Sequence, residues 1–171
     1  MSRLLTTVIL ILLLSLFVWF IIHKCSPILS KRILLFIMLL TLVSVLWVTL
    51  ISRQPSSETV INLKPHFYQQ LFRIKYNSDG SFSRIQFGPL YEETKLNVLL
   101  FIPLGLLLPI VVFEFDALWK VLLTGFIISI IIETVQYVSH LGWFDIDDVL
   151  MNTIGVCIGY LEFKLLFKKR L

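Results

Sequence analysis

Five apolar stretches, separated by polar segments, dominate the pattern of hydrophobic and polar positions along the chain. Each stretch approaches the roughly 20 residues that a helix needs to cross the hydrocarbon core of a bilayer. They cover residues 4–22, 33–51, 96–113, 119–138 and 149–167. The first is long for a signal peptide and no small-x-small cleavage site follows it, so we interpret it as a retained span. The pattern predicts an all-α, multispanning membrane helix bundle of five transmembrane helices, forming a single domain over residues 1–171.

Composition supports the same class of protein. The chain is 57% hydrophobic and 15% charged, with a mean hydropathy of +0.90. Soluble domains are about half apolar and about a quarter charged, so this chain cannot hide its apolar side chains from water. The net charge of +4 is carried by residues at the ends of apolar runs, without a basic stripe, and no nucleic-acid partner is expected. Cys25 and Cys157 give no disulfide framework.

Lysine and arginine in the short connections predict the orientation, because they gather on the cytoplasmic side. The connection 139–148 holds three Asp and neither Lys nor Arg, whereas the long loop 52–95 holds six basic residues. The orientation therefore depends on the short connections, and we expect the N-terminus outside and the C-terminus inside the cell. The cytoplasmic face would then hold Lys24, Lys31, Arg32, Lys120, Lys164, Lys168, Lys169 and Arg170.

The long loop 52–95 contains a pattern typical of a small β-hairpin on the extracytoplasmic side. Apolar and basic residues alternate over residues 72–76, and a second alternating run covers residues 82–87. Between them lies Asn77-Ser78-Asp79-Gly80, a turn-forming run in which Gly80 is free to take positive φ. We expect the hairpin to lie against the membrane surface or to cap the helices; the alternative is an irregular loop with scattered aromatic residues.

Polar residues inside or at the ends of apolar spans are the candidate functional residues, because lipid penalises them. Glu133 and Gln136 are three residues apart and share a helix face. If the last helix begins near Asp145, one face also carries Asp145, Asp148 and Asn152. Asp147 points away from these neighbours and is expected to be a solvated capping residue. We infer a polar pocket open to the outside, built from Asn97, Glu133, Gln136, Asp145, Asp148 and Asn152.

A hydrogen-bond network that only holds the helices together is the structural alternative to this pocket. Small residues and prolines are the candidates for helix packing and bending. Gly155 and Gly159 form a small-xxx-small pair that lets another helix approach closely. Pro103, followed by Gly105, frees a backbone carbonyl and bends its helix, and Pro109 lies one and a half turns further on.

Four elements of the sequence resemble the signatures of the VanZ-like family of bacterial membrane proteins. They occur in order over about the second two-thirds of the chain, although Leu141-Gly142-Trp143-Phe144 stands where many relatives have a basic residue before the Asp cluster. The resemblance implies a multispanning cell-membrane protein, and the name-giving member confers low-level resistance to teicoplanin. The four elements are Asn62-Leu63-Lys64-Pro65, the run from Asn97 through Pro103 to Gly105, Glu133-Thr134-Val135-Gln136, and the run from Asp145 through Asp148 and Asn152 to Gly155.

Three functions follow from the residues and the resemblance. The first is a non-enzymatic protein that lowers susceptibility to lipophilic glycopeptide antibiotics through an outward-facing acidic pocket, with membrane lipid, a lipid-linked cell-wall precursor or the glycopeptide as partner and no cofactor. The second is an enzyme in which Glu133, Asp145, Asp148 and Asn152 hold Mg²⁺ and act on a lipid-linked pyrophosphate. The third is a small cation- or proton-coupled transporter, since membrane carboxylates often relay protons.

Overall fold

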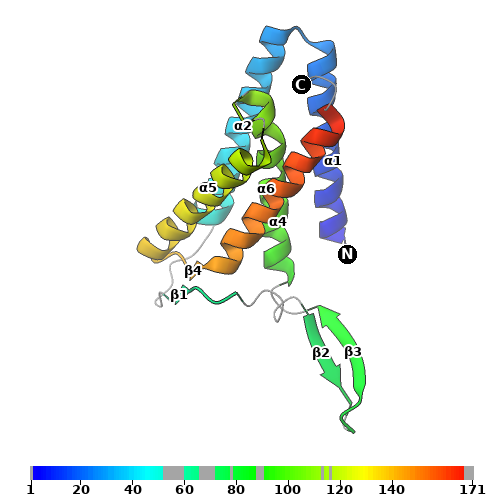
Figure 1. Ribbon diagram of the computed structural model, residues 1–171, viewed down its shortest axis with the longest axis vertical. Helices are drawn as coiled ribbons and strands as arrows, with labels where there is room; N and C mark the ends of the chain where they lie inside the picture. Colours follow the sequence, from blue (N-terminus) through cyan, green and yellow to red (C-terminus); the bar gives the residue numbers. More distant parts are fainter. Residues whose placement is uncertain are drawn as a thin grey trace.

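Five helices make up most of the described chain (Figure 1). The structure is a computed structural model, and it describes residues 2–51, 60–65, 72–77, 79–87, 91–112, 114–115 and 117–167. Each of the five predicted apolar stretches corresponds to one of these helices, although the second continues past its helix to residue 51 and residue 113 of the third lies outside the described residues. The expectation of a mostly helical chain is therefore confirmed. The helices are α1 (Ser2–Lys24), α2 (Pro27–Leu46), α4 (Tyr91–Val111), α5 (Leu118–Val138) and α6 (Ile146–Phe167).

Three helical segments are long and apolar enough to cross a membrane. They are Ile28–Ile51, Leu118–Val138 and Ile146–Phe167. The first joins α2 to η1 (Trp47–Ile51), a π-helical turn that continues it. Over the residues searched, α1 and α4 contribute the shorter apolar segments Leu13–Lys24 and Lys95–Val111. These candidate spans, identified by length and composition, indicate a multi-pass membrane protein.

The outer surface of α2 explains why the chain needs lipid around it. Leu39, Val43 and Trp47 are 50%, 60% and 58% exposed, whereas Leu34 and Val45 on the other side are buried. A contiguous apolar surface of this kind marks contact with a membrane or a partner rather than with water.

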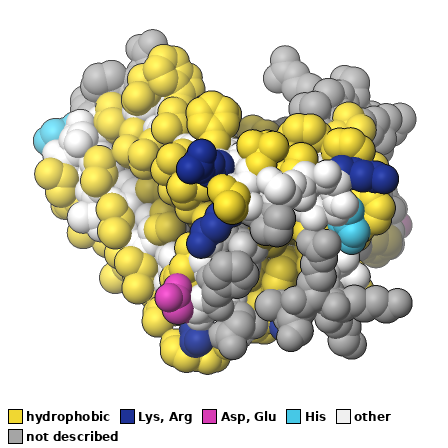
Figure 2. Space-filling view, turned by 90° about the horizontal axis from the view of Figure 1, so that it is seen from above, with side chains coloured by type: hydrophobic (Ala, Val, Ile, Leu, Met, Phe, Trp, Pro, Cys, Tyr) yellow, Lys and Arg dark blue, Asp and Glu magenta, His cyan; other side chains and the backbone are white. Residues whose placement is uncertain are grey.

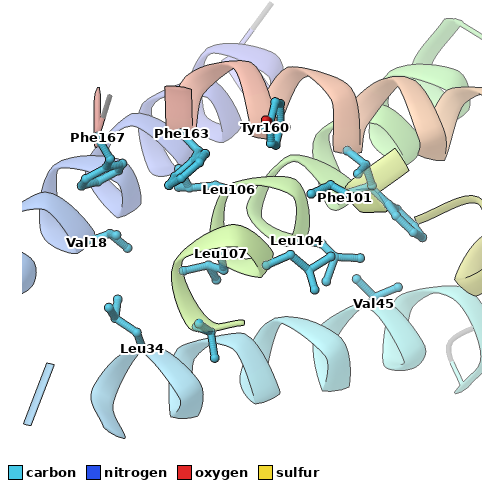
Figure 3. Close-up of a cluster of buried hydrophobic side chains, with 14 of the residues drawn as sticks. Val18, Leu34, Val45, Phe101, Leu104, Leu106, Leu107, Tyr160, Phe163 and Phe167 are labelled. Atoms are coloured by element: carbon cyan, nitrogen blue, oxygen red, sulfur yellow. The ribbon is translucent and has the colours of Figure 1, made fainter. Parts of the chain in front are cut away.

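The core lies around α4, which is surrounded by the other helices (Figure 3). Phe101, Leu106 and Leu107 of α4 are completely buried. They pack against α1, α2 and α6, through residues that include Val18, Leu34, Val45, Tyr160, Phe163 and Phe167. A helix enclosed in this way needs little lipid-facing surface of its own.

A hairpin of β2 (Phe72–Tyr76) and β3 (Phe82–Phe87) interrupts the helices. The strands are antiparallel, with Ile74 opposite Ile85, and Gly80 has φ 81° in the turn. The Ser81 hydroxyl and N–H both donate to Asp79 Oδ1, at 2.6 and 2.8 Å, and these hydrogen bonds lower the pKa of Asp79. The predicted hairpin is therefore confirmed. It projects away from the helices (Figure 1), so the expectation that it caps them is wrong.

Candidate functional site

Asp145 is the centre of the polar contacts at the start of α6. Its Oδ1 accepts from the N–H of Asp147 at 2.9 Å, so Asp145 caps the helix that begins at Ile146. Its own N–H donates to Glu133 Oε2 of α5 at 3.1 Å, and its Oδ2 accepts from Asn62 Nδ2 at 3.3 Å. One aspartate therefore connects α6, α5 and the long loop.

The turn after α5 brings the chain back to Glu133. Leu141 N–H donates to the Gln136 carbonyl at 2.8 Å, and His140 N–H donates to the Tyr137 carbonyl at 3.2 Å. His140 has φ 56°, so the helix ends in a Schellman motif with a non-glycine residue in the left-handed position. The chain thus reverses within a few residues, and Asp145 reaches the carboxylate of Glu133.

The long loop returns to the same place through two short strands. β1 (Ile61–Asn62) pairs in parallel with β4 (Phe144–Asp145), and Asn62 lies opposite Asp145. Phe144 N–H also donates to the Val60 carbonyl at 3.0 Å. This pairing, visible at the lower end of the bundle in Figure 1, brings the element that begins at Asn62 to the Asp cluster.

α4 joins the site through Asn97. Its Nδ2 donates to Asp148 Oδ1 at 2.6 Å, and Asp148 lies in the first turn of α6. Both Asp147 and Asp148 are near the positive end of the helix dipole, which stabilises carboxylates there.

α5 presents a buried polar stripe to its neighbours. Ser129, Glu133 and Gln136 are 0%, 2% and 1% exposed and follow the period of the helix. Ser129 Oγ accepts from Asn152 Nδ2 of α6 at 2.8 Å. Gln136 Nε2 donates to the Thr49 carbonyl of η1 at 2.8 Å, in the last turn of that segment, where carbonyls lack helical partners.

Two buried acceptors remain without a donor among the described residues. They are Gln136 Oε1 and Asn152 Oδ1. Buried polar atoms are usually hydrogen-bonded, and unpaired ones are costly. The interior of the site therefore contains hydrogen-bond acceptors that no donor among the described residues satisfies.

Glycine lets α4 and α6 approach backbone to backbone. A Cβ at Gly105 would overlap the Val156 carbonyl, and one at Gly159 would overlap the Ile102 carbonyl. Gly155 is similarly close to the Val98 carbonyl. Pro103 and Pro109 both lie inside α4. Close packing along this seam sets the separation at which Asn97 reaches Asp148.

The predicted site residues all lie at one end of the bundle, joined in pairs rather than around a common centre. Asn97 contacts Asp148, Glu133 contacts Asp145, and Asn152 and Gln136 have separate partners. The expectation for Asp147 is wrong: it is 7% exposed, and Asp145 caps the helix in its place. Ser129 and Thr49 were not predicted to belong to the site, and Asn62 was predicted only as part of a motif. The helical spacing between Ser129 and Glu133 could have revealed Ser129, whereas no local signal in the sequence points to Thr49 or Asn62.

The carboxylates do not form an evident metal site. Among the described residues, no group of three or more His, Cys, Asp or Glu side chains is arranged to hold a metal ion. Glu133, Asp145 and Asp148 therefore make no such group, and the Mg²⁺ alternative gains no support from the geometry.

The other end of the bundle is basic. Figure 2 shows this end, where α1 ends and α2 begins, with Lys and Arg side chains among apolar ones. By their positions in α1, α2, α5 and α6, the basic residues near this end include Lys24, Lys31, Arg32, Lys120 and Lys164. Lys120 Nζ donates to the Glu114 carbonyl at 2.8 Å. The basic residues of the short connections thus lie at the end opposite the Asp cluster, while the long loop at the Asp-cluster end carries basic residues of its own.

Known proteins resemble the part of the chain that contains the site. The sequence model of the family described as VanZ/LLP1 matches residues 32–167, which contain every residue of the site. The chain is 31% identical to "Protein VanZ" of Enterococcus faecium over 126 residues, covering 74% of this chain and 68% of that protein. No solved structure matches the chain.

Proposed function

Since the chain belongs to the VanZ/LLP1 family, we propose that it lowers the susceptibility of a bacterium to lipophilic glycopeptides such as teicoplanin. The acidic end of the bundle would act on the outer face of the cell membrane, where such drugs meet the cell. The groups that would bind the ligand are the carboxylates of Glu133, Asp145 and Asp148, with Asn97, Gln136 and Asn152 around them.

The basic short connection between α1 and α2, at the end opposite the Asp cluster, carries this proposal. Asp145, Asp147 and Asp148 lie at the end opposite Lys24, Lys31 and Arg32. Basic residues in short connections stay in the cytoplasm, so the acidic end would face outward, with the N-terminus outside and the C-terminus inside. On this topology all five helices cross the bilayer, and α4 does so inside the bundle.

The balance of donors and acceptors indicates the kind of group that would bind. The carboxylates, and the oxygens of Gln136 and Asn152 that have no donor among the described residues, are all hydrogen-bond acceptors. A ligand that supplies ammonium, amide or hydroxyl donors would complement them, because hydrogen bonds to charged groups are the stronger ones. The amino and hydroxyl groups of a glycopeptide are donors of this kind.

Antibiotic tolerance in a susceptible bacterium tests the proposal. Expression of the chain should raise tolerance to teicoplanin and leave tolerance to vancomycin, which has no lipid tail, nearly unchanged. Asp148→Asn should abolish the effect, because it keeps an oxygen for Asn97 but removes the charge. The matched control is Asp79→Asn in the exposed hairpin turn, which should retain the effect.

Minimum inhibitory concentrations are measured alongside the amount of protein in the membrane. No change for either drug, with the protein present in the membrane, would contradict the proposal. An equal rise for both drugs would favour a general change in wall synthesis, as the enzyme alternative requires.

A further inference from the structure

A groove of about 420 Å³ lies between α2 and α4, next to the polar contacts of Asn97. Lining residues from Ile37 to Val48 form one wall, those from Leu96 to Pro103 form the other, and Leu14 of α1 also lines the groove. Its volume falls in the range of small-molecule sites, which is about 300–1,000 Å³.

The walls of the groove are apolar. Two of its polar residues, Thr41 and Ser44, donate their hydroxyls to the Ile37 and Leu40 carbonyls of their own helix, at 2.9 and 2.8 Å. Those hydroxyl protons are therefore already used, and most of the other lining residues are Leu, Ile, Val or Pro. An occupant of this part of the groove must be hydrocarbon.

The groove has the length of a lipid tail and opens toward the bilayer. From Ile37 to Val48 it extends roughly 16 Å at about 1.5 Å per residue, close to half of the ~30 Å hydrocarbon core. Leu40 lines it and is 50% exposed, so an acyl chain in the same leaflet has lateral access.

One end of the groove reaches the acidic site. Asn97 lines it and also donates to Asp148 Oδ1 at 2.6 Å. Leu99 and Pro103 line it as well, and because proline has no N–H, the Leu99 carbonyl lacks its usual helical donor. Asp148 lies behind Asn97 rather than among the lining residues, so its negative charge acts on this end of the groove from a neighbouring position. That charge and the Leu99 carbonyl favour amino or hydroxyl groups over a phosphate.

We propose that this groove binds the acyl chain of a lipid-tailed glycoside, with its amino- or hydroxyl-bearing head at Asn97 and Asp148. This inference deepens the proposed function and rests on it for its biological meaning, since it names the tail of a lipophilic glycopeptide as the part that is held. The phosphate of a membrane phospholipid would lie near the Asp148 carboxylate, so phospholipid is the disfavoured occupant.

Photolabelling of the full chain in phosphatidylcholine nanodiscs tests the groove. The probe is an alkyl glucoside with a diazirine in its tail, and mass spectrometry locates the adducts. We expect adducts on residues that line the groove, reduced several-fold by unlabelled alkyl glucoside and little by an alkyl phosphate of the same chain length. Asp148→Asn should narrow this difference between the two competitors.

Leu40→Trp and Leu39→Trp form the matched pair of variants. Both positions are 50% exposed on α2, but Leu40 lines the groove and Leu39 does not. Leu40→Trp should lower the labelling several-fold, and Leu39→Trp should leave it unchanged. Labelling that is insensitive to both variants and to competitor would mean ordinary contact with surrounding lipid and would overturn the proposal.

Two further outcomes separate the groove from the antibiotic role. Equal competition by the alkyl phosphate would overturn the glycoside assignment and make phospholipid the occupant. Saturable, Leu40-dependent labelling in a chain that gives no teicoplanin tolerance would support the groove and contradict the proposed function. Tolerance without saturable labelling would overturn the groove and leave the proposed function standing.

Discussion

At the scale of single residues, the acidic side chains of the site have two roles that must be distinguished. Asp145 caps α6 and joins it to α5 and the long loop, so it contributes to the fold whatever else it binds. The buried stripe of α5 likewise holds helices together. Contacts of this kind average about 0.6 kcal/mol each in membrane proteins. The charge of a carboxylate, in contrast, is not needed to accept a hydrogen bond.

Glu133→Gln separates the charge from the hydrogen bond. The glutamine oxygen still accepts from the Asp145 N–H, so we expect normal insertion, normal expression and loss of teicoplanin tolerance. Glu133→Leu removes the acceptor as well and should lower the free energy of unfolding by about 1–3 kcal/mol. Thermal unfolding in detergent and inhibitory concentrations measure the two effects. Full activity of Glu133→Gln and of Asp148→Asn would show that the carboxylates only hold helices together.

The residues of the site were predictable where polarity conflicts with a lipid environment. That conflict identified Asn97, Glu133, Gln136, Asp148 and Asn152. It could not identify partners, because Asn62 reaches Asp145 across 83 positions of sequence. It also led to the wrong expectation that Asp147 is solvated, since spacing on a helix does not reveal that Asp145, two residues earlier, caps the helix.

At the scale of elements, three glycines at the interface between α4 and α6 set the distance between these two helices, and with it the geometry of the site. Backbone carbonyls lie where the Cβ atoms of Gly105, Gly155 and Gly159 would be. Backbone can yield only if one helix moves. A wider seam would also lengthen the contact between Asn97 and Asp148.

Gly159→Ala should therefore destabilise the bundle and weaken function together. We expect the free energy of unfolding to fall by about 1–3 kcal/mol, as for other overpacked sites. Gly125→Ala is the comparison, because its Cβ would meet the Val156 side chain, at 2.6 Å from Cγ2, rather than backbone. Its effect on thermal unfolding in detergent should be smaller. Equal destabilisation by the two variants would contradict this account of the seam.

Elements were predictable where a periodic pattern or a turn sequence defines them locally. The alternation of apolar and polar residues before and after residues 77–80 predicted the hairpin with both of its strands. Helix starts were less predictable, since α4 begins at Tyr91 and includes charged residues ahead of its apolar run. The pairing of β1 with β4 has no local signal, because each strand has two residues and its partner is distant.

At the scale of the whole molecule, α4 and α6 form the centre and the remaining helices pack around them. The number of helices followed from hydropathy, but their packing did not, because lipid-facing and protein-facing sides of a span are equally apolar. α1 lies entirely before the part that matches the family and is joined to α6 by a hydrogen bond of 2.6 Å from Ser15 Oγ to Glu162 Oε1. That contact was not predicted, since Glu162 had been included in an apolar span.

Orientation is the property of the whole molecule on which the proposed function depends most. Ser83 in β3 and Ser26 between α1 and α2 are both exposed and lie at opposite ends of the molecule (Figure 1). In a chain whose Cys25 and Cys157 are replaced by serine, Ser83→Cys should react with an impermeant maleimide in intact cells. Ser26→Cys should react only after the membrane is permeabilised, because the proposed topology places Lys24, Lys31 and Arg32 in the cytoplasm. The reverse pattern would place Asp145 and Asp148 inside the cell, where they could not meet a drug arriving from outside.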